Sequence, residues 1–512
     1  MQQSKLKSLD FLKIADQFKL GELTTEKRHP LTMNLSLLSK TNLPKAVEIL
    51  KSIDLSLFDV LQAQFPNLLK LKNIFSQTIN SGGRIFFSGC GSTGRLSLTL
   101  EFLWRQSCEV ANQECVIGMM AGGDSALIKA IEDFEDHPEY AHRHLSELGF
   151  RDGDLLVGSS EGGETPFVIG SVEYALKHTK IKPWFVYCNP DNELIKTTQR
   201  SKIILQNNSI NKLNLTCGPM AISGSTRMQA STIILYALGL ALLSTDEPNL
   251  KERFFNLKDT FQKLNLDFLP SFIELESSAY EQGYLLNYLT NNLGVTILTD
   301  TTERAPTFNL TPFENCHNKT DLPALCNLSL LETTSAKQAW NTLLMRKPRC
   351  LNWKEFPITN LNYFYGFDIS ASNLKRRQEI TAPHSPIDFT LLEHQKVITW
   401  NLQNLKATID CSRLDHLEIH LLQKMLLNIH STLVMGRMNR YEGNLMTYVK
   451  PSCNKLIDRA IRYVTHLLKD HGITRSYEEI CHALFDELEH VSPSDPIVLL
   501  TLYKFTKSTI TK

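Results

Sequence analysis

The sequence has no excess of charge of either sign, because 54 lysines and arginines are matched by 54 aspartates and glutamates. Such a balance argues against nucleic acid or an anionic membrane surface as the main partner. The most apolar run, 233–243, is too short to cross a bilayer and predicts a buried helix instead. Charged residues interrupt the first twenty positions, so this stretch does not resemble a signal peptide. We therefore expect a cytoplasmic protein with no nucleic-acid or membrane partner.

The eleven cysteines form no C-x-x-C pair and no cysteine/histidine spacing typical of zinc sites. In a chain of 512 residues they predict reduced thiols rather than a disulfide framework. We expect no metal and no cofactor. An N-terminal cysteine nucleophile is absent and none of the fifteen histidines stands out as catalytic, which disfavours an amidotransferase or isomerase. The first 55 residues contain no basic recognition helix, which disfavours a transcription regulator.

The length predicts two to four domains, and the pattern in the first half is that of an α/β protein. A helix is predicted at 58–78, followed by apolar runs that alternate with helical patterns and predict strands at 85–87, 116–120, 155–157, 184–187 and 202–205. This alternation is typical of a parallel sheet covered by helices, which binds ligands at the carboxyl ends of its strands.

A glycine-rich loop at 88–94, SGCGSTG, joins the first predicted strand to a helix. Glycines let the backbone approach a ligand closely, and the N–H groups at the start of a helix attract anions such as phosphate. The loop also matches the dinucleotide pattern G-x-G-x-x-G, although the acidic residue after the next strand comes late, at Asp124. It is not a Walker A motif, because Arg95 and Leu96 occupy the Lys and Ser/Thr positions. A purely structural turn is the remaining alternative.

Two further loops are rich in glycine and hydroxyls: 158–166, GSSEGGETP, and 223–228, SGSTRM. Each by itself is compatible with an ordinary helix N-cap. Because carboxyl ends of parallel strands meet at one edge of a sheet, three such loops favour a shared anion site. This site would hold its ligand with hydroxyls and backbone N–H groups rather than with lysines.

These loops occur in the order found in sugar isomerase (SIS) domains: SGCGSTGRL, MMAGGD followed by AIEDFED, VGSSEGGETPFVIG, CNP and GPMAISGSTRM. More narrowly, the sequence resembles the N-acetylmuramic acid 6-phosphate etherases and the glucokinase regulatory protein. A second α/β unit beginning GVTILTDTTERAPTFNLTPF precedes the segment 441–464, and this arrangement is similar to the regulatory protein. The resemblance covers about residues 60–510.

The resemblance implies two SIS domains, each a flavodoxin-like parallel sheet, with a helical C-terminal cap. We expect an N-terminal segment at 1–55, SIS domains at 56–250 and 270–440, and the cap at 441–512. The two SIS domains would pair within one chain, so a monomer is expected. The apolar tail 492–505 is either a partner-binding element or, as we favour, a core helix of the cap.

By the same resemblance, sugar phosphate would be bound by residues from all of these parts: Gly91, Ser92, Thr93, Glu135, Ser160, Gly162, Ser225, Glu303 and Lys455. Hydroxyls of the three loops would contact the phosphate, and Glu135 and Glu303 would contact the sugar. Alternatives stay open for single residues: Glu303 as an ion-pair partner of Arg304 or another base, Lys455 as a surface lysine, and Arg227 as a salt-bridge partner.

The etherases use two glutamates as acid and base, a pairing suited to elimination and hydration at an ether. The first aligns here with Leu103, which cannot transfer a proton, and the second with Glu135. Glu101 lies two residues from Leu103, about 200° around a helix, so we expect it on a solvated or interdomain face.

The incomplete pair favours a regulatory protein over an enzyme. The resemblance implies binding of fructose 6-phosphate and fructose 1-phosphate, and inhibition of a glucokinase or related hexokinase-type enzyme. The alternative is an active etherase that releases D-lactate, with Glu135 catalytic and the missing glutamate replaced by Glu101 or by a residue of the second domain.

Overall fold

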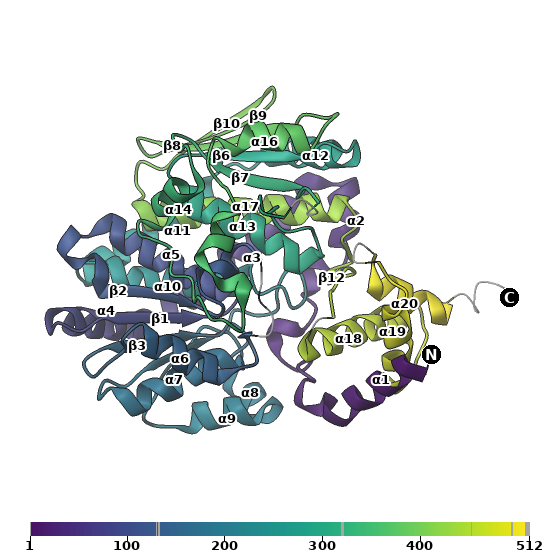
Figure 1. Ribbon diagram of the computed structural model, residues 1–512, viewed down its shortest axis with the longest axis horizontal. Coiled ribbons are helices and arrows are strands. Elements are labelled where there is room, and N and C mark those ends of the chain that lie inside the picture. Colours follow the sequence, from purple (N-terminus) through teal and green to yellow (C-terminus); the bar gives the residue numbers. More distant parts are fainter. Residues whose placement is uncertain are drawn as a thin grey trace.

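The computed structural model describes residues 2–129, 131, 134–318, 322–451, 453–492 and 495–506. It contains two α/β units and a helical C-terminal region (Figure 1). This confirms the predicted fold class. In the described part, none of the helices combines the length and apolar character that a bilayer crossing requires.

The first sheet is parallel throughout, with the strand order β2-β1-β3-β4-β5. Its strands are β1 (Ile85–Gly89), β2 (Val116–Met120), β3 (Leu155–Ser159), β4 (Trp184–Tyr187) and β5 (Asn211–Asn214). Every residue of β1 to β4 is buried, which explains why these strands are unbroken apolar runs in the sequence.

The predicted fifth strand at 202–205 is wrong. These residues lie in helix α9 (Gln199–Gln206), which begins after Thr198, whose hydroxyl accepts a hydrogen bond from the Ser201 N–H at 3.3 Å. The true fifth strand, β5, has the sequence NKLN and buries only Leu213. An edge strand this short and polar has no apolar run by which to recognise it.

The predicted helix at 58–78 is two helices, α3 (Leu43–Ala63) and α4 (Phe65–Asn80), which meet at Gln64. Proline lies in the first turn of each, where its missing N–H costs no hydrogen bond, and Pro66 therefore marks the start of α4. Helix α4 then leads into β1.

The second sheet is mixed, with the order β10-β9-β8-β6-β7. Strands β6 (Leu286–Thr290), β7 (Cys326–Leu330) and β8 (Ile387–His394) are parallel, as predicted for a SIS domain. Strands β9 (Val397–Leu402) and β10 (Leu405–Asp410) extend it as antiparallel hairpins. The turn between β8 and β9 has two residues with positive φ, Gln395 at 48° and Lys396 at 61°, as tight hairpins require.

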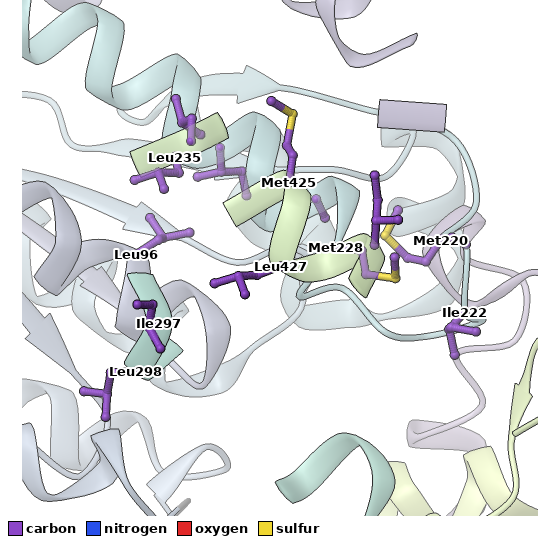
Figure 2. Close-up of a cluster of buried hydrophobic side chains, with 14 of the residues drawn as sticks. Leu96, Met220, Ile222, Met228, Leu235, Ile297, Leu298, Met425 and Leu427 are labelled. Atoms are coloured by element: carbon purple, nitrogen blue, oxygen red, sulfur yellow. The ribbon is translucent and has the colours of Figure 1, made fainter. Parts of the chain in front are cut away.

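Four helices form the junction between the two units: α5 (Ser92–Ser107), α10 (Gln229–Leu243), α13 (Gly294–Phe308) and α17 (His416–Arg437). Figure 2 shows their apolar side chains, including Leu96, Leu235, Ile297 and Met425, in one cluster. Each is at most 4% exposed, and burying a side chain of this size stabilises the fold by about 1.5–3 kcal/mol. The two units therefore share a core.

The C-terminal region lies to one side of the two units (Figure 1). It consists of α18 (Asn454–Asp470), α19 (Tyr477–Leu488) and α20 (Ile497–Thr506), and the N-terminal helix α1 (Gln2–Ile14) packs on α19. The hairpin of β11 (Tyr441–Glu442) and β12 (Leu445–Met446) precedes it. Helix α20 packs against α18 and α19 and buries Val498 and Leu502, so the described part of the predicted tail is a core helix of the cap.

The remaining α-helices of the described chain are α2 (Leu35–Thr41), α6 (Pro138–Glu147), α7 (Pro166–His178), α8 (Asp191–Thr197), α11 (Glu247–Lys263), α12 (Leu269–Glu281), α14 (Ala336–Leu344), α15 (Leu361–Tyr365) and α16 (Asn373–Ile380).

Candidate functional site

A cavity of about 210 Å³ lies beyond the carboxyl ends of the first sheet's strands, where this unit meets α13 and the cap. Eight of the nine predicted site residues line it: Gly91, Ser92, Thr93, Glu135, Gly162, Ser225, Glu303 and Lys455. The ninth, Ser160, is not part of the wall. The fold thus brings together residues up to 364 positions apart in the sequence, from Gly91 to Lys455.

The first loop turns sharply between β1 and α5. Gly91 has a φ of +54°, a conformation that favours glycine. A Cβ on Gly89 would lie 2.2 Å from the backbone carbon of Thr93, so the strand and the helix can approach this closely only with glycine there. The Thr93 hydroxyl donates to the Cys90 carbonyl and accepts from the Cys90 N–H, both at 2.9 Å, which closes the turn.

Glu303 enters the cavity wall from α13 of the second unit. Its carboxylate accepts a hydrogen bond from the Ser92 hydroxyl at 2.8 Å and forms an ion pair with the buried Arg95. Arg95 also donates to the Leu127 carbonyl at 3.0 Å. The sequence left open an ion pair of Glu303 with Arg304 or with another base, and the partner is Arg95. Arg304 pairs instead with Asp300 and Glu276 of its own unit.

The second loop is organised from inside by Ser160. Its hydroxyl accepts from the N–H groups of Gly163, Glu164 and Thr165 at 3.1–3.3 Å and donates to the Thr165 hydroxyl. Ser160 thereby holds the loop that presents Gly162 to the cavity. Its hydroxyl points into the loop and not into the cavity.

Glu161 of the same loop also lines the cavity, and sequence reasoning did not single it out. Its carboxylate accepts hydrogen bonds from the Thr226 hydroxyl at 2.7 Å and from the Ser231 hydroxyl. Burial raises the pKa of Glu161 to about 7, although both hydroxyls oppose the shift. The sequence signal that could have indicated Glu161 is a glutamate within a loop rich in glycine and serine. The environment of its carboxyl group, however, is set by Thr226 and Ser231, which lie 65 and 70 positions away.

The third loop contributes Ser225 and Arg227 to the wall. Arg227 forms an ion pair with Asp300 at 3.1 Å and donates to the Thr432 hydroxyl at 3.2 Å. It thus links the first unit to α13 and α17. This agrees with the alternative prediction from the sequence that Arg227 is a salt-bridge partner.

Lys455 reaches the cavity from the first turn of α18 in the cap. Its ammonium group donates to Glu164 at 2.7 Å and to Glu135 at 3.3 Å. Burial alone would lower the pKa of Lys455, but these two carboxylates raise it well above its ordinary value. Burial likewise would raise the pKa of Glu164, yet Lys455 and Arg200 bring it down to about 2. Lys455 therefore lines the cavity as a side chain paired with two carboxylates, and it is not a free surface lysine.

Glu135 lies in the segment that precedes α6. Its neighbour Phe134 packs on Trp353 and Phe356 of the second unit, with ring centroids 5.5 and 4.7 Å apart. The Glu135 carbonyl accepts from the Phe167 N–H at 3.0 Å. Of the predicted motif 130–136, residues 130, 132 and 133 lie outside the described residues.

The N-terminal segment provides a part of the wall that the sequence did not reveal. Leu20, Leu23, Thr25 and Glu26 line the cavity, and Glu26 forms an ion pair with Arg459 of α18 at 2.6 Å. Arg459 and Arg462 lower the pKa of Glu26 despite its burial. No spacing or composition in 1–55 indicates this role, because the partner residues lie more than 400 positions away.

Glu101 and Leu103, by contrast, lie outside the cavity wall. Leu103 is fully buried. We expected Glu101 on a solvated or an interdomain face. It lies at the interface of the two units and is buried there. It pairs with Arg346 and Arg349 of the second unit, both at 2.9 Å, and these arginines lower its pKa to about 2 despite burial. A carboxylate held in this way cannot replace the missing glutamate of an acid–base pair.

The described residues contain no group of three or more histidine, cysteine, aspartate or glutamate side chains suited to a metal ion. Hydroxyls, backbone groups and paired charges line the cavity, and such groups can bind an anion and the hydroxyls of a polar ligand.

Comparison with known families agrees with this geometry. Residues 68–176 match the family described as the glucokinase regulatory protein N-terminal SIS domain. An N-acetylmuramic acid 6-phosphate etherase from Salmonella agona is 32% identical over 216 residues, which is 42% of this chain and 66% of that protein. The etherase from Aliivibrio fischeri is 29% identical over 218 residues, with the same coverage. The chain thus spans just under two thirds of the length of these curated relatives.

Among solved structures, the C-terminal domain of glucosamine-fructose-6-phosphate aminotransferase from Francisella tularensis aligns with 77% of this chain and 96% of its own. The TM-score is 0.39 at 10% sequence identity.

A parallel sheet whose glycine- and hydroxyl-rich loops converge at the carboxyl ends of its strands defines the class, that of the SIS domains. Residues 68–176 of the first α/β unit match a SIS-domain family, and the chain is similar to the glucokinase regulatory protein and to the etherases.

Proposed function

We propose that this chain binds a sugar phosphate in the cavity and acts as a regulatory protein that inhibits a glucokinase or related sugar kinase. The observation that carries the proposal is the composition of the wall. Loops of the first unit, Glu303 of the second and Lys455 of the cap all face one small cavity. A ligand bound there touches all three parts at once.

The chemistry of the wall suits a sugar phosphate. Ser92, Ser225 and the backbone of the glycine loop supply donors for phosphate oxygens, and the carboxylates of Glu135 and Glu303 supply acceptors for sugar hydroxyls. The volume of about 210 Å³ is below the roughly 300–1,000 Å³ typical of drug-sized ligands, which favours a compact metabolite.

Regulation follows if the ligand binds two arrangements of the cap unequally. Lys455 and Arg459 connect α18 to Glu164 and Glu26 on the other side of the cavity. A ligand that competes for these partners changes the free energy of the closed arrangement, and by linkage the affinity for a kinase partner changes by the same factor. Fructose 6-phosphate and fructose 1-phosphate would favour different arrangements, as the resemblance to the regulatory protein implies.

Isothermal titration calorimetry with fructose 6-phosphate and fructose 1-phosphate tests the proposal. We expect binding of at least one, and a loss of roughly ten- to a hundredfold in affinity for Lys455→Met, because hydrogen bonds to charged groups contribute about 1.5–3 kcal/mol. Lys469→Met, an exposed lysine on the same helix, is the matched control and should bind like the native chain. Absence of binding for both sugar phosphates would contradict the proposal.

Kinase inhibition needs its own assay. A glucokinase-type enzyme is assayed with increasing amounts of this chain, with and without each fructose phosphate. We expect inhibition that one of the two ligands strengthens and the other relieves. Equal kinase rates under all conditions would leave a sugar-phosphate-binding protein without this target and would contradict the regulatory half of the proposal.

The relatives named N-acetylmuramic acid 6-phosphate etherase favour a second candidate, an etherase that releases D-lactate. Against it, Leu103 occupies the position of one catalytic glutamate and Glu101 is held by arginines away from the cavity. Incubation with N-acetylmuramic acid 6-phosphate and an enzymatic lactate assay decides the matter. Release of D-lactate at enzyme-like rates, abolished by Glu135→Gln, would establish an etherase and contradict the proposed regulatory function.

A further inference from the structure

Glu161 occupies a place between two of the loops expected to hold the phosphate. It belongs to the second loop, and its carboxylate is tied to the third loop by Thr226 and to α10 by Ser231. The residue is 8% exposed, and it helps to form the wall of the cavity. The two hydroxyls hold the carboxylate in this position by hydrogen bonds.

The other charged side chains of the wall have partners of opposite sign. Arg95 pairs with Glu303, Lys455 with Glu135 and Glu164, Arg459 with Glu26, and Arg227 with Asp300. Glu161 differs, because no lysine, arginine or histidine of the described residues forms an ion pair with it. Among the described carboxyl groups of the wall, it is the one without an ion-pair partner.

The groups that face Glu161 come from three elements. Glu303 on α13 repels a negative charge there, and Lys424 on α17 attracts it without forming an ion pair. The Cys188 thiol, after β4, is the third group, and burial, Cys217 and Glu161 together raise its pKa. Burial is the largest influence and keeps the pKa of Glu161 near 7, so the group can change its protonation state close to neutral pH.

We propose that the cavity takes up one proton when it binds a phosphate monoester, and that the Glu161 carboxylate accepts it. This rests on the proposed binding of a sugar phosphate. A dianionic phosphate beside an ionised carboxylate in a buried site meets strong repulsion, which protonation of the carboxylate removes. The proton comes from the solvent or its buffer and forms an O–H bond on Glu161, and no bond of the ligand is made or broken. The protonated carboxyl can then donate to a ligand oxygen.

The proposal predicts a specific pH dependence. Above about pH 7.5 a phosphate monoester is almost entirely dianionic, since its second pKa is about 6, so its own titration no longer changes the affinity. Glu161 is then mostly ionised in the free protein, and binding must include proton uptake. The dissociation constant of fructose 6-phosphate should rise about tenfold per pH unit between pH 7.5 and 8.5.

Calorimetry with fructose 6-phosphate in two buffers of different ionisation enthalpy, HEPES and Tris, at pH 8.0 measures the proton directly. The observed enthalpy should differ between the buffers by the difference in their ionisation enthalpies multiplied by a value close to one proton. For Glu161→Gln we expect no buffer dependence, and binding at pH 8.5 equal to or tighter than that of the native chain. Glu22→Gln, an exposed glutamate in the segment beside the cavity, should behave like the native chain.

Buffer-independent enthalpy in the native chain would overturn the inference, and so would proton uptake that persists in a folded Glu161→Gln protein. The measurement on the native chain decides the question even if the variant fails to fold. Failure of the proposed function has a different signature, since fructose 6-phosphate would then show no binding heat in either buffer.

Discussion

Buried charged residues in this protein occur in groups whose members come from distant parts of the chain. Glu101 is the clearest example, because it accepts from Arg105 at 3.0 Å, from Arg346 and from Arg349, and also from the Gly118 N–H at 3.1 Å. A buried ion group adds little net stability over an apolar one, but removal of a single member leaves the others buried without a partner.

Glu101→Gln should therefore lower the free energy of unfolding by about 3–5 kcal/mol at pH 7. The pKa of Glu101 in the folded protein is lowered to about 2, below its ordinary value near 4.5. The stabilisation by the ionised group is thus complete above about pH 5 and is lost as the pH falls toward 2. Urea denaturation at pH 7 and pH 3 should show that the difference between variant and native chain shrinks at the lower pH.

Glu48→Gln is the matched control, because Glu48 pairs with Lys45 on the surface and such pairs contribute little. A Glu101→Gln variant as stable as this control at pH 7 would contradict the structural role of the buried group.

At the scale of single elements, the loop from β1 to α5 depends on glycines for two different reasons. Gly89 must lack a Cβ because of the backbone of Thr93, whereas a Cβ on Gly91 would meet nothing within 4 Å. Gly91 is needed instead for its φ of +54°. One position is limited by contact and the other by backbone conformation.

The two glycines should respond differently to alanine. Gly91→Ala should lower the free energy of unfolding by about 1–3 kcal/mol and leave a foldable loop, because a φ of +54° with a ψ of −121° is a conformation that residues with a Cβ rarely adopt. Gly89→Ala must separate β1 from α5, so we expect a larger loss of stability and no measurable binding of sugar phosphate. Denaturation curves and calorimetry on both variants test this, and equal effects of the two substitutions would show that the close approach of strand and helix is not required.

For the molecule as a whole, the pairing of two α/β units within one chain affects whether two copies of the protein can associate. Helices α10 and α17 pack against one another, and nearly all of their residues are buried in the shared core. The surfaces through which such units pair are therefore already covered inside the chain.

We accordingly expect a monomer in solution. Size-exclusion chromatography with light scattering should give a mass near 58.2 kDa, independent of protein concentration. The physical reason is that a second copy would find no free equivalent of the α10–α17 surface. A stable mass of twice this value would contradict the expectation and would indicate a further interface.

Local sequence was sufficient where a structure depends on near neighbours. The buried strands β1 to β4 are apolar runs, and the tight loop at 88–94 is visible from its glycines because a turn needs them within a few residues. It was not sufficient for β5, a polar edge strand that the remaining sheet stabilises, or for the break between α3 and α4.

By itself, therefore, the sequence determined an α/β fold, its main strands and the three loops that border the site. Only the tertiary structure decided that Glu303 pairs with Arg95, that Glu26 lines the wall, that Ser160 faces inward and that Glu161 forms no ion pair within the described residues. The reason is that burial and charge pairing depend on groups that are far apart in the sequence and adjacent only in the folded chain, whereas periodicity and turn geometry are local.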